Sequence, residues 1–157
     1  LTKKPNPVLR YRDVAIWNEA RNTNEMPTLA EIRAAVCVIR SQKFPDWEVM
    51  GTAGSFFKNP IISETHFTEL VKQFPLLPGY PTGDGVVKVS LGWILEHVLS
   101  LRGYQEGNVG TYEGQALVVV NHGGATAREL ETFADALSKK IFDATQIVVE
   151  REVTKLS

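Results

Sequence analysis

Apolar residues recur at helical spacing in two long segments of the chain, and each segment begins with the same polar signature. Thr28 stands three residues before Glu31, and Thr126 stands three residues before Glu129, which is the spacing of a capping box. The apolar members are Leu29, Ile32, Val36 and Ile39 in the first segment and Leu130, Phe133, Ala134, Leu137 and Ile141 in the second. Each set falls on one helical face, so the pattern predicts helices over 28–44 and 126–141.

Shorter patterns predict the remaining elements. Ser63 and Ser90 are good N-caps for helices over 63–73 and 91–101, and the apolar run over 116–120 predicts a buried strand. Further short strands are predicted over 8–11, 55–58, 86–89 and 147–154, with loops over 18–27, 75–85 and 103–114. Helices and strands alternate without a regular βαβ repeat. The pattern therefore predicts an α+β fold, in which a small mixed or antiparallel sheet packs with about four helices in a single domain.

Composition and charge narrow the class of protein. The 157 residues suit one domain, and the net charge of −1 gives no electrostatic reason to expect nucleic acid or an anionic membrane as a partner. No apolar run approaches the roughly 20 residues of a membrane span. The single cysteine, Cys37, cannot form an intrachain disulfide, which is typical of a cytoplasmic protein. We therefore predict a cytoplasmic domain without a nucleic-acid or membrane partner.

Two patterns could carry chemistry, although spacing alone favours a structural role for both. Ser55 stands between Gly54 and two phenylalanines, where it could donate a proton, but the segment lacks the Gly-x-Ser-x-Gly elbow of a hydrolase. The structural alternative is a turn at the glycine with phenylalanines that pack in the core. Glu150 and Glu152 would share one face of a strand and could serve acid chemistry, but a solvated sheet edge explains them equally.

Two other patterns could bind a ligand, but each also has a structural explanation or lacks the required spacing. The turn from Asn121 to Thr126 joins a predicted strand to a helix and could bind phosphate, although a tight turn with an N-cap is the simpler explanation. The three histidines, His66, His97 and His122, lack the spacing of metal ligands, so the sequence predicts no metal site.

Taken together, several segments in order along the chain resemble a known family. They are Pro7–Asp13, Ile32–Arg40, Lys43–Asp46, Gly54–Pro60, Gly92–Ile94, Gln115–Asn121, Gly123–Thr126 and Glu152–Val153. This order resembles the C-terminal domain of UDP-N-acetylenolpyruvoylglucosamine reductase, the MurB family. The resemblance implies an oxidoreductase of peptidoglycan synthesis. Such an enzyme reduces the enolpyruvyl ether of UDP-N-acetylglucosamine to UDP-N-acetylmuramate, with NADPH as reductant and FAD as the flavin.

The resemblance also implies roles for single residues. Ser55 matches the serine that donates a proton to the substrate, and Glu152 matches the glutamate that, with an arginine, stabilises the enolate. Lys43 and Asn59 match contacts to the substrate diphosphate, and Tyr80 and Gln115 match further substrate contacts. The residues given these roles are Ser55 and Glu152 as catalytic groups and Lys43, Asn59, Tyr80 and Gln115 as substrate-binding groups.

Missing family residues limit the reactions that this chain could catalyse alone. The family's catalytic arginine and its FAD-binding residues have no counterpart here, and Tyr112 stands where many relatives have histidine. We therefore expect residues 1–14 to be the end of an absent FAD-binding domain or a linker and 15–157 to be the substrate-binding domain. The isolated chain is predicted to be inactive and to lack flavin. The alternatives are a stand-alone nucleotide-sugar or phosphate-binding module without redox chemistry and a purely structural domain.

Overall fold

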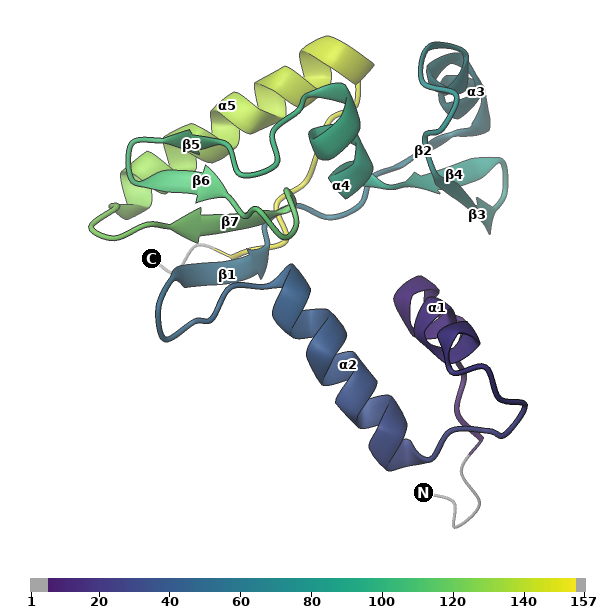
Figure 1. The fold of residues 1–157 in the computed structure, drawn as a ribbon. Helices are drawn as coiled ribbons and strands as arrows, with labels where there is room; N and C mark the ends of the chain where they lie inside the picture. Colours follow the sequence, from purple (N-terminus) through teal and green to yellow (C-terminus); the bar gives the residue numbers. More distant parts are fainter. Residues whose placement is uncertain (1–5, 155–157) are drawn as a thin grey trace. The chain divides into compact units, whose positions relative to one another are not determined.

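The computed structural model describes residues 6–154, and these separate into two compact units, one up to Lys43 and one from Phe44 onward. The first unit holds the helices α1 (Arg12–Ala20) and α2 (Leu29–Lys43). The second holds seven strands and the remaining helices, which Figure 1 labels along the chain. None of the helices formed by residues 6–154 combines the length and the apolar character of a membrane span.

Local capping explains where α2 begins. The backbone N–H and the hydroxyl of Thr28 both donate to the Glu31 carboxylate at 2.7 Å, and the Glu31 N–H donates back to the Thr28 hydroxyl. The predicted capping box is thus confirmed.

The strand predicted over 8–11 is wrong, because residues 6–10 form no regular element and Tyr11 directly precedes α1. The segment Arg12–Ala20 contains neither proline nor glycine, so a helix can form there without interruption. Residues 1–5 of the predicted segment 1–14 lie outside the described part.

The larger sheet of the second unit lies against the longest helix. Its antiparallel strands run in the order β1 (Gly51–Ser55), β7 (Val118–Asn121), β6 (Val109–Thr111) and β5 (Gln105–Glu106). The helix α5 (Ala127–Thr145) covers one face of this sheet, as Figure 1 shows, and begins with the predicted capping box of Thr126 and Glu129. The buried stripe of α5, from Phe133 to Ile141, belongs to the same core cluster as Leu117 and Val119.

The smaller sheet forms around a tight hairpin. Its antiparallel strands run in the order β2 (Ile61–Ser63), β4 (Val86–Val89) and β3 (Gly79–Gly83), with α3 (Glu64–Gln73) packed against them. The hairpin turns at Asp84 and Gly85, whose φ angles of 49° and 71° suit an Asp-Gly pair. The loop predicted over 75–85 is therefore wrong for Gly79–Gly83. This segment forms an outer strand, where Pro81 is tolerated because only one side of the strand is paired.

Several other predicted elements differ from the structure. The loop expected over 103–114 contains β5 and β6, and the strand expected over 55–58 is wrong because β1 ends at Ser55. The helix expected over 91–101 is a short α-helix, α4 (Leu91–Trp93), followed by the π-helical segment η1 (Ile94–Val98), in which the Leu99 N–H donates to the Ile94 carbonyl at 3.1 Å. The strand expected over 147–154 is reduced to one antiparallel bridge between Arg151 and Phe57. A chain end that pairs through a few residues satisfies the backbone without a full strand.

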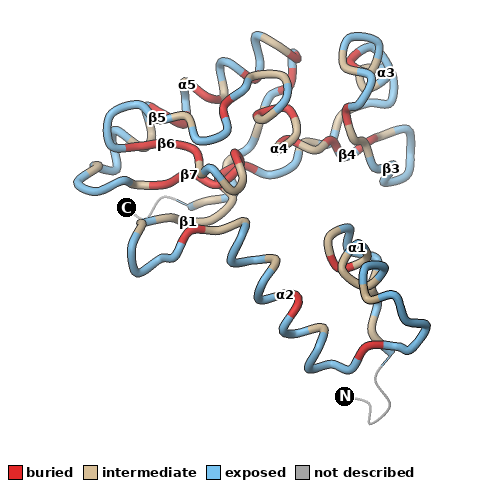
Figure 2. The backbone as a smooth tube through the Cα atoms, in the orientation of Figure 1, coloured by how far each residue is buried: buried red, intermediate tan, exposed pale blue. Residues whose placement is uncertain are grey.

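Burial concentrates in the second unit, as the red segments in Figure 2 show. The core cluster joins the face of α5, the helix α4 with η1, and the two phenylalanines that follow Ser55. In α2, by contrast, only Ala35 is buried. The α+β prediction is confirmed, with two purely antiparallel sheets in place of one.

The cap of α5 predicts a specific dependence of stability on pH. The backbone hydrogen bond from Thr126, followed by that from its hydroxyl, holds the pKa of Glu129 below its ordinary value of 4.5. A carboxyl with a lowered folded-state pKa stabilises the fold above its unfolded pKa and loses that effect as the pH falls through the folded pKa. We therefore expect the Tm difference between the wild type and Glu129→Gln to be largest near neutral pH and to shrink towards about pH 3.

Thermal unfolding followed by circular dichroism measures this difference. Glu113→Gln removes a carboxylate that takes no part in a helix cap and serves as the control. A constant gap between the wild type and Glu129→Gln at all pH values would contradict the prediction.

Candidate functional site

The two predicted catalytic residues meet at the backbone of Phe56. The Phe56 N–H donates to the Leu117 carbonyl at 2.9 Å, and the Phe56 carbonyl accepts from the Glu152 N–H at 2.9 Å. Ser55 directly precedes Phe56, so this single residue links Ser55 to Glu152. A second bond, from the Lys58 N–H to the Glu150 carbonyl at 2.9 Å, extends the pairing. We call Ser55–Lys58 with Glu150–Glu152 the catalytic ladder.

The charged neighbours in the catalytic ladder are paired with each other or with α5. Lys58 forms an ion pair with Glu150, and Arg151 reaches the Asp135 carboxylate at 2.6 Å. The Arg151 guanidinium also lies 5.9 Å from the centre of the Phe56 ring. Among residues 6–154, by contrast, neither the half-buried Ser55 hydroxyl nor the exposed Glu152 carboxylate has a hydrogen-bond partner. The arrangement leaves these two groups available to an external molecule.

Asn59 has a structural task that the sequence did not reveal. Its side-chain Oδ1 accepts the N–H of Leu91 at 3.0 Å, at the start of α4. The serine predicted to cap this helix, Ser90, makes no such bond. Asn59 therefore ties the end of the catalytic ladder to α4.

Gln115 is held at the same short helix. A Cβ atom at Gly92 would lie 3.9 Å from Nε2 of Gln115, so the amide lies close above that glycine. The next residue, Ala116, is fully buried, and its N–H donates to Oε1 of Glu96 at 3.2 Å. The α4–η1 segment thus bonds Asn59 and lies close to the Gln115 amide. Neither Glu96 nor its contact with Ala116 was predicted, because a helical glutamate gives no local signal of a partner twenty residues away.

The other two predicted substrate contacts lie elsewhere in the chain. Tyr80 is on β3 of the smaller sheet, where it is 56% exposed and stands opposite Lys88. No described bond ties Tyr80 to the catalytic ladder, so its role stays a prediction.

Lys43 is the last residue of α2, in the first unit. It forms an ion pair with Asp13, and its ammonium lies 5.7 Å from the centre of the Tyr11 ring. Burial alone would lower the pKa of Lys43, but the hydrogen bond to Asp13 and the attraction of Tyr11 and Asp13 outweigh it and raise that pKa. Lys43 is therefore a firmly protonated cation.

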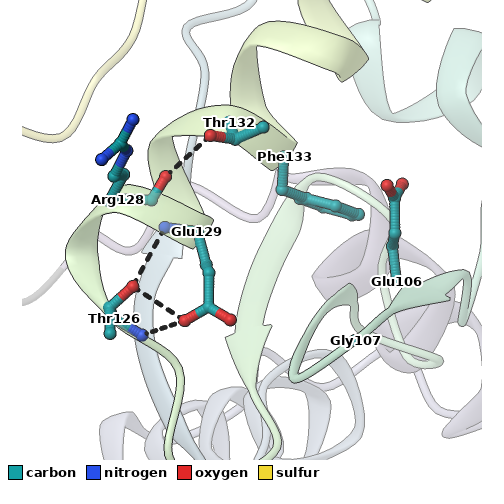
Figure 3. Close-up of a pocket in the computed structure, with 7 residues that line it drawn as sticks. All are labelled: Glu106, Gly107, Thr126, Arg128, Glu129, Thr132 and Phe133. Atoms are coloured by element: carbon teal, nitrogen blue, oxygen red, sulfur yellow. Dashed lines mark hydrogen bonds between the residues drawn. The ribbon is translucent and has the colours of Figure 1, made fainter.

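A separate cavity lies beside the start of α5, and Figure 3 shows its lining. Its volume is about 330 Å³, and Phe133 and Glu106 lie at one side of it. Thr126 and Glu129 point toward each other and complete the helix cap, which leaves their polar atoms engaged. None of the predicted site residues lines this cavity. Among residues 6–154, no group of three His, Cys, Asp or Glu side chains could hold a metal ion.

The fold and the catalytic ladder define an α+β domain that presents a hydroxyl and a carboxylate beside one strand of its larger sheet. Residues 45–156 match the family described as UDP-N-acetylenolpyruvoylglucosamine reductase, C-terminal domain. The chain belongs to this family.

Individual relatives show the same likeness along nearly the whole chain. The UDP-N-acetylenolpyruvoylglucosamine reductase of Porphyromonas gingivalis is 41% identical over 154 residues, which is 98% of this chain and 44% of that protein. The proteins of that name from Shewanella baltica and Flavobacterium johnsoniae are 39% and 36% identical, over 97% and 98% of this chain and 43% and 45% of theirs. The chain therefore spans less than half the length of these relatives.

The contact between Glu96 and Ala116 predicts a stability effect. Glu96→Ala would leave a fully buried N–H without an acceptor, which costs about 1–3 kcal/mol. Glu96→Gln keeps an acceptor oxygen and serves as the matched control, with a smaller loss expected. Urea unfolding of both variants measures the free energy of unfolding. Equal losses in the two variants would show that the hydrogen bond to Ala116 does not stabilise this loop.

Proposed function

We propose that this chain is the C-terminal part of a flavin-dependent reductase that converts UDP-N-acetylglucosamine enolpyruvate to UDP-N-acetylmuramate with NADPH, in cytoplasmic peptidoglycan synthesis. Membership of the reductase family supports the substrate class. The observation that carries the proposal is the catalytic ladder. It places Ser55 directly before Phe56, whose carbonyl accepts the Glu152 N–H, and leaves the side chains of Ser55 and Glu152 without a described partner.

Reduction of the enol ether needs a hydride on the terminal carbon and a proton on the adjacent carbon. We assign the proton to the Ser55 hydroxyl, which would give it to the carbanionic carbon and recover a proton from solvent. Because serine is a weak acid, this transfer requires a strongly basic carbon held close to the oxygen. The half-buried position of Ser55, next to the fully anchored Phe56, suits such a fixed donor.

Glu152 is assigned to the substrate carboxylate, which gains charge as the enolate develops. Donors aimed at that charge before the reaction lower the barrier, and a glutamate is such a donor only when it carries a proton. Glu152 is exposed among the described residues. Its protonated form would be favoured by burial against the rest of the longer protein and the substrate. We also place the partner arginine outside this chain, because the family's catalytic arginine has no counterpart here and the neighbouring Arg151 is paired with Asp135.

Two cavities of the second unit are small for a flavin dinucleotide. Their volumes are about 330 and 290 Å³, and helix-cap or loop side chains line much of them. Sites for drug-sized ligands begin at about this volume and extend to roughly 1,000 Å³. We therefore place FAD and NADPH, which supply the hydride, on parts of the reductase outside this chain.

We assign the substrate diphosphate to Lys43 and Asn59, with Gln115 and Tyr80 as further contacts. Lys43 supports this role as a protonated amine with three donors, so it can keep its bond to Asp13 and still bind an oxyanion. Asn59 uses its oxygen to cap α4, which orients the amide nitrogen as a donor. Gln115 lies close to Gly92, as described above.

The role of Ser55 predicts a defect in turnover. In the full-length reductase, we expect Ser55→Ala to lower kcat by about 10²- to 10⁴-fold, the usual contribution of a positioned proton donor. KM should change little, because the hydroxyl acts mainly in the transition state. Steady-state oxidation of NADPH measures both constants. Ser138→Ala, which removes a hydroxyl bonded only to the Ala134 carbonyl on α5, is the control. A Ser55→Ala enzyme with a normal kcat would exclude Ser55 as the donor.

The role of Glu152 as a hydrogen-bond donor predicts that Gln can replace it. We expect Glu152→Gln to keep near-normal turnover in the full-length protein, because its amide still donates to the substrate carboxylate. Glu152→Ala removes the donor and should lower kcat by about 10²-fold or more. The same steady-state assay compares the two variants. If Glu152→Gln loses as much activity as Glu152→Ala, the protonated-donor role is wrong.

A further inference from the structure

The strand that leads to Ser55 contains an extra residue. On β1 and β7, Thr52 stands opposite Val120 and Ser55 stands opposite Val118, with a break in the register between them. Ala53 and Gly54 therefore share a single opposing residue, Val119, which makes this a β-bulge. Gly54 has a φ of +81°, a conformation that side chains other than that of glycine rarely adopt.

The bulge decides which face of the sheet receives Ser55. Directly opposed residues of an antiparallel pair point to the same face, and a shift of one residue reverses every side chain that follows. Leu117 and Val119 belong to the core cluster beneath α5, whereas Val118 and Val120, which are also buried, lie outside that cluster. Without the extra residue, Ser55 would stand opposite Leu117 and face this core. With it, Ser55 pairs with Val118 on the other face.

The same shift places Phe56 in the core. Its N–H bonds to the Leu117 carbonyl, and the side chain is 2% exposed within the core cluster. A regular strand would exchange the faces on which the serine and the phenylalanine lie, and would place the polar hydroxyl in the core beneath α5. The bulge is therefore a condition for any chemistry at Ser55.

One side chain holds the bulge together. The Thr52 hydroxyl donates to the Val119 carbonyl at 2.9 Å and accepts the Gly54 N–H at 3.0 Å. Val119 is 3% exposed, so its carbonyl would otherwise be a buried acceptor on the side facing β1. A single hydroxyl thus bonds a backbone group on each strand at the point where the extra residue interrupts the ladder.

We propose that Thr52 is a positioning residue that acts through Ser55, by bracing the bulge that turns the Ser55 hydroxyl away from the core. This inference rests on the proposed role of Ser55 as the proton donor. Thr52 itself touches no reacting atom in this scheme, because both hydrogen bonds of its hydroxyl go to the backbone. The bracing by Thr52 can nevertheless be tested whether or not Ser55 donates the proton.

Thr52→Val and Thr52→Ser in the full-length reductase form a matched pair. Valine keeps the branched shape and the strand preference but removes the hydroxyl, whereas serine keeps the hydroxyl. For Thr52→Val, we expect faster hydrogen–deuterium exchange in the peptide over residues 51–57 and a kcat lower by about 10- to 100-fold, the cost of a small misplacement of a reacting group. KM should stay within about threefold. Thr52→Ser should match the wild type in both exchange and kcat.

A double-mutant cycle separates positioning from general stability. If Thr52 acts through Ser55, Thr52→Val should lower kcat no further in a Ser55→Ala background. Wild-type exchange in Thr52→Val would show that Thr52 does not hold the bulge in place. Faster exchange with a normal kcat would overturn the positioning role, and so would additive losses of kcat in the double-mutant cycle. A normal kcat in Ser55→Ala alone would instead refute the proposed proton donor. The exchange measurement would then still show whether Thr52 holds the bulge in place. If Thr52→Val does not fold, the smaller Thr52→Ala takes its place in every arm.

Discussion

The two-sided pairing of the Phe56 backbone is the interaction on which the candidate site depends. Its N–H is bonded to the loop before β7, and its carbonyl is bonded to the C-terminal segment at Glu152. A backbone group buried without a partner costs more than the modest net gain of making the bond, so both neighbours are held in register. The aromatic ring of Phe56 meets that of Phe57 in an edge-to-face contact with centroids 5.2 Å apart, which anchors the strand in the core.

The charges around this pairing follow from the same geometry. The antiparallel bridge between Phe57 and Arg151 sets Lys58 opposite Glu150 and brings Arg151 to the side of α5, where Asp135 receives it. The ion pairs at the surface contribute little to stability by themselves. Because the neighbouring cations and anions pair with one another, they do not occupy the Ser55 hydroxyl or the Glu152 carboxylate. Ser55 and Glu152 are then the groups of the catalytic ladder that an incoming ligand can engage.

Sequence patterns predicted the parts of the fold that depend on nearby residues. The capping boxes at Thr28 and Thr126 and the cap at Ser63 involve partners three residues away, and all three are present. Some features that depend on distant partners were mispredicted. Ser90 has the local chemistry of a cap, yet the Leu91 N–H is bonded by Asn59, which precedes the neighbouring strand β2. The predicted site residues came from a family resemblance, and no local spacing in the sequence could show that Ser55 and Glu152 flank one peptide.

Backbone pairing places Ser55 and Glu152, and this limits how much the candidate site must reorganise when a ligand binds. Side chains on loops must be ordered when a ligand binds, which reduces the free energy left for the reaction. Here Ser55 follows a bulge at which the Thr52 hydroxyl bonds both strands, and Glu152 follows the bridge between Phe57 and Arg151, so backbone pairing sets where both residues lie before any substrate arrives. Catalytic groups held in this way need little reorganisation in the transition state.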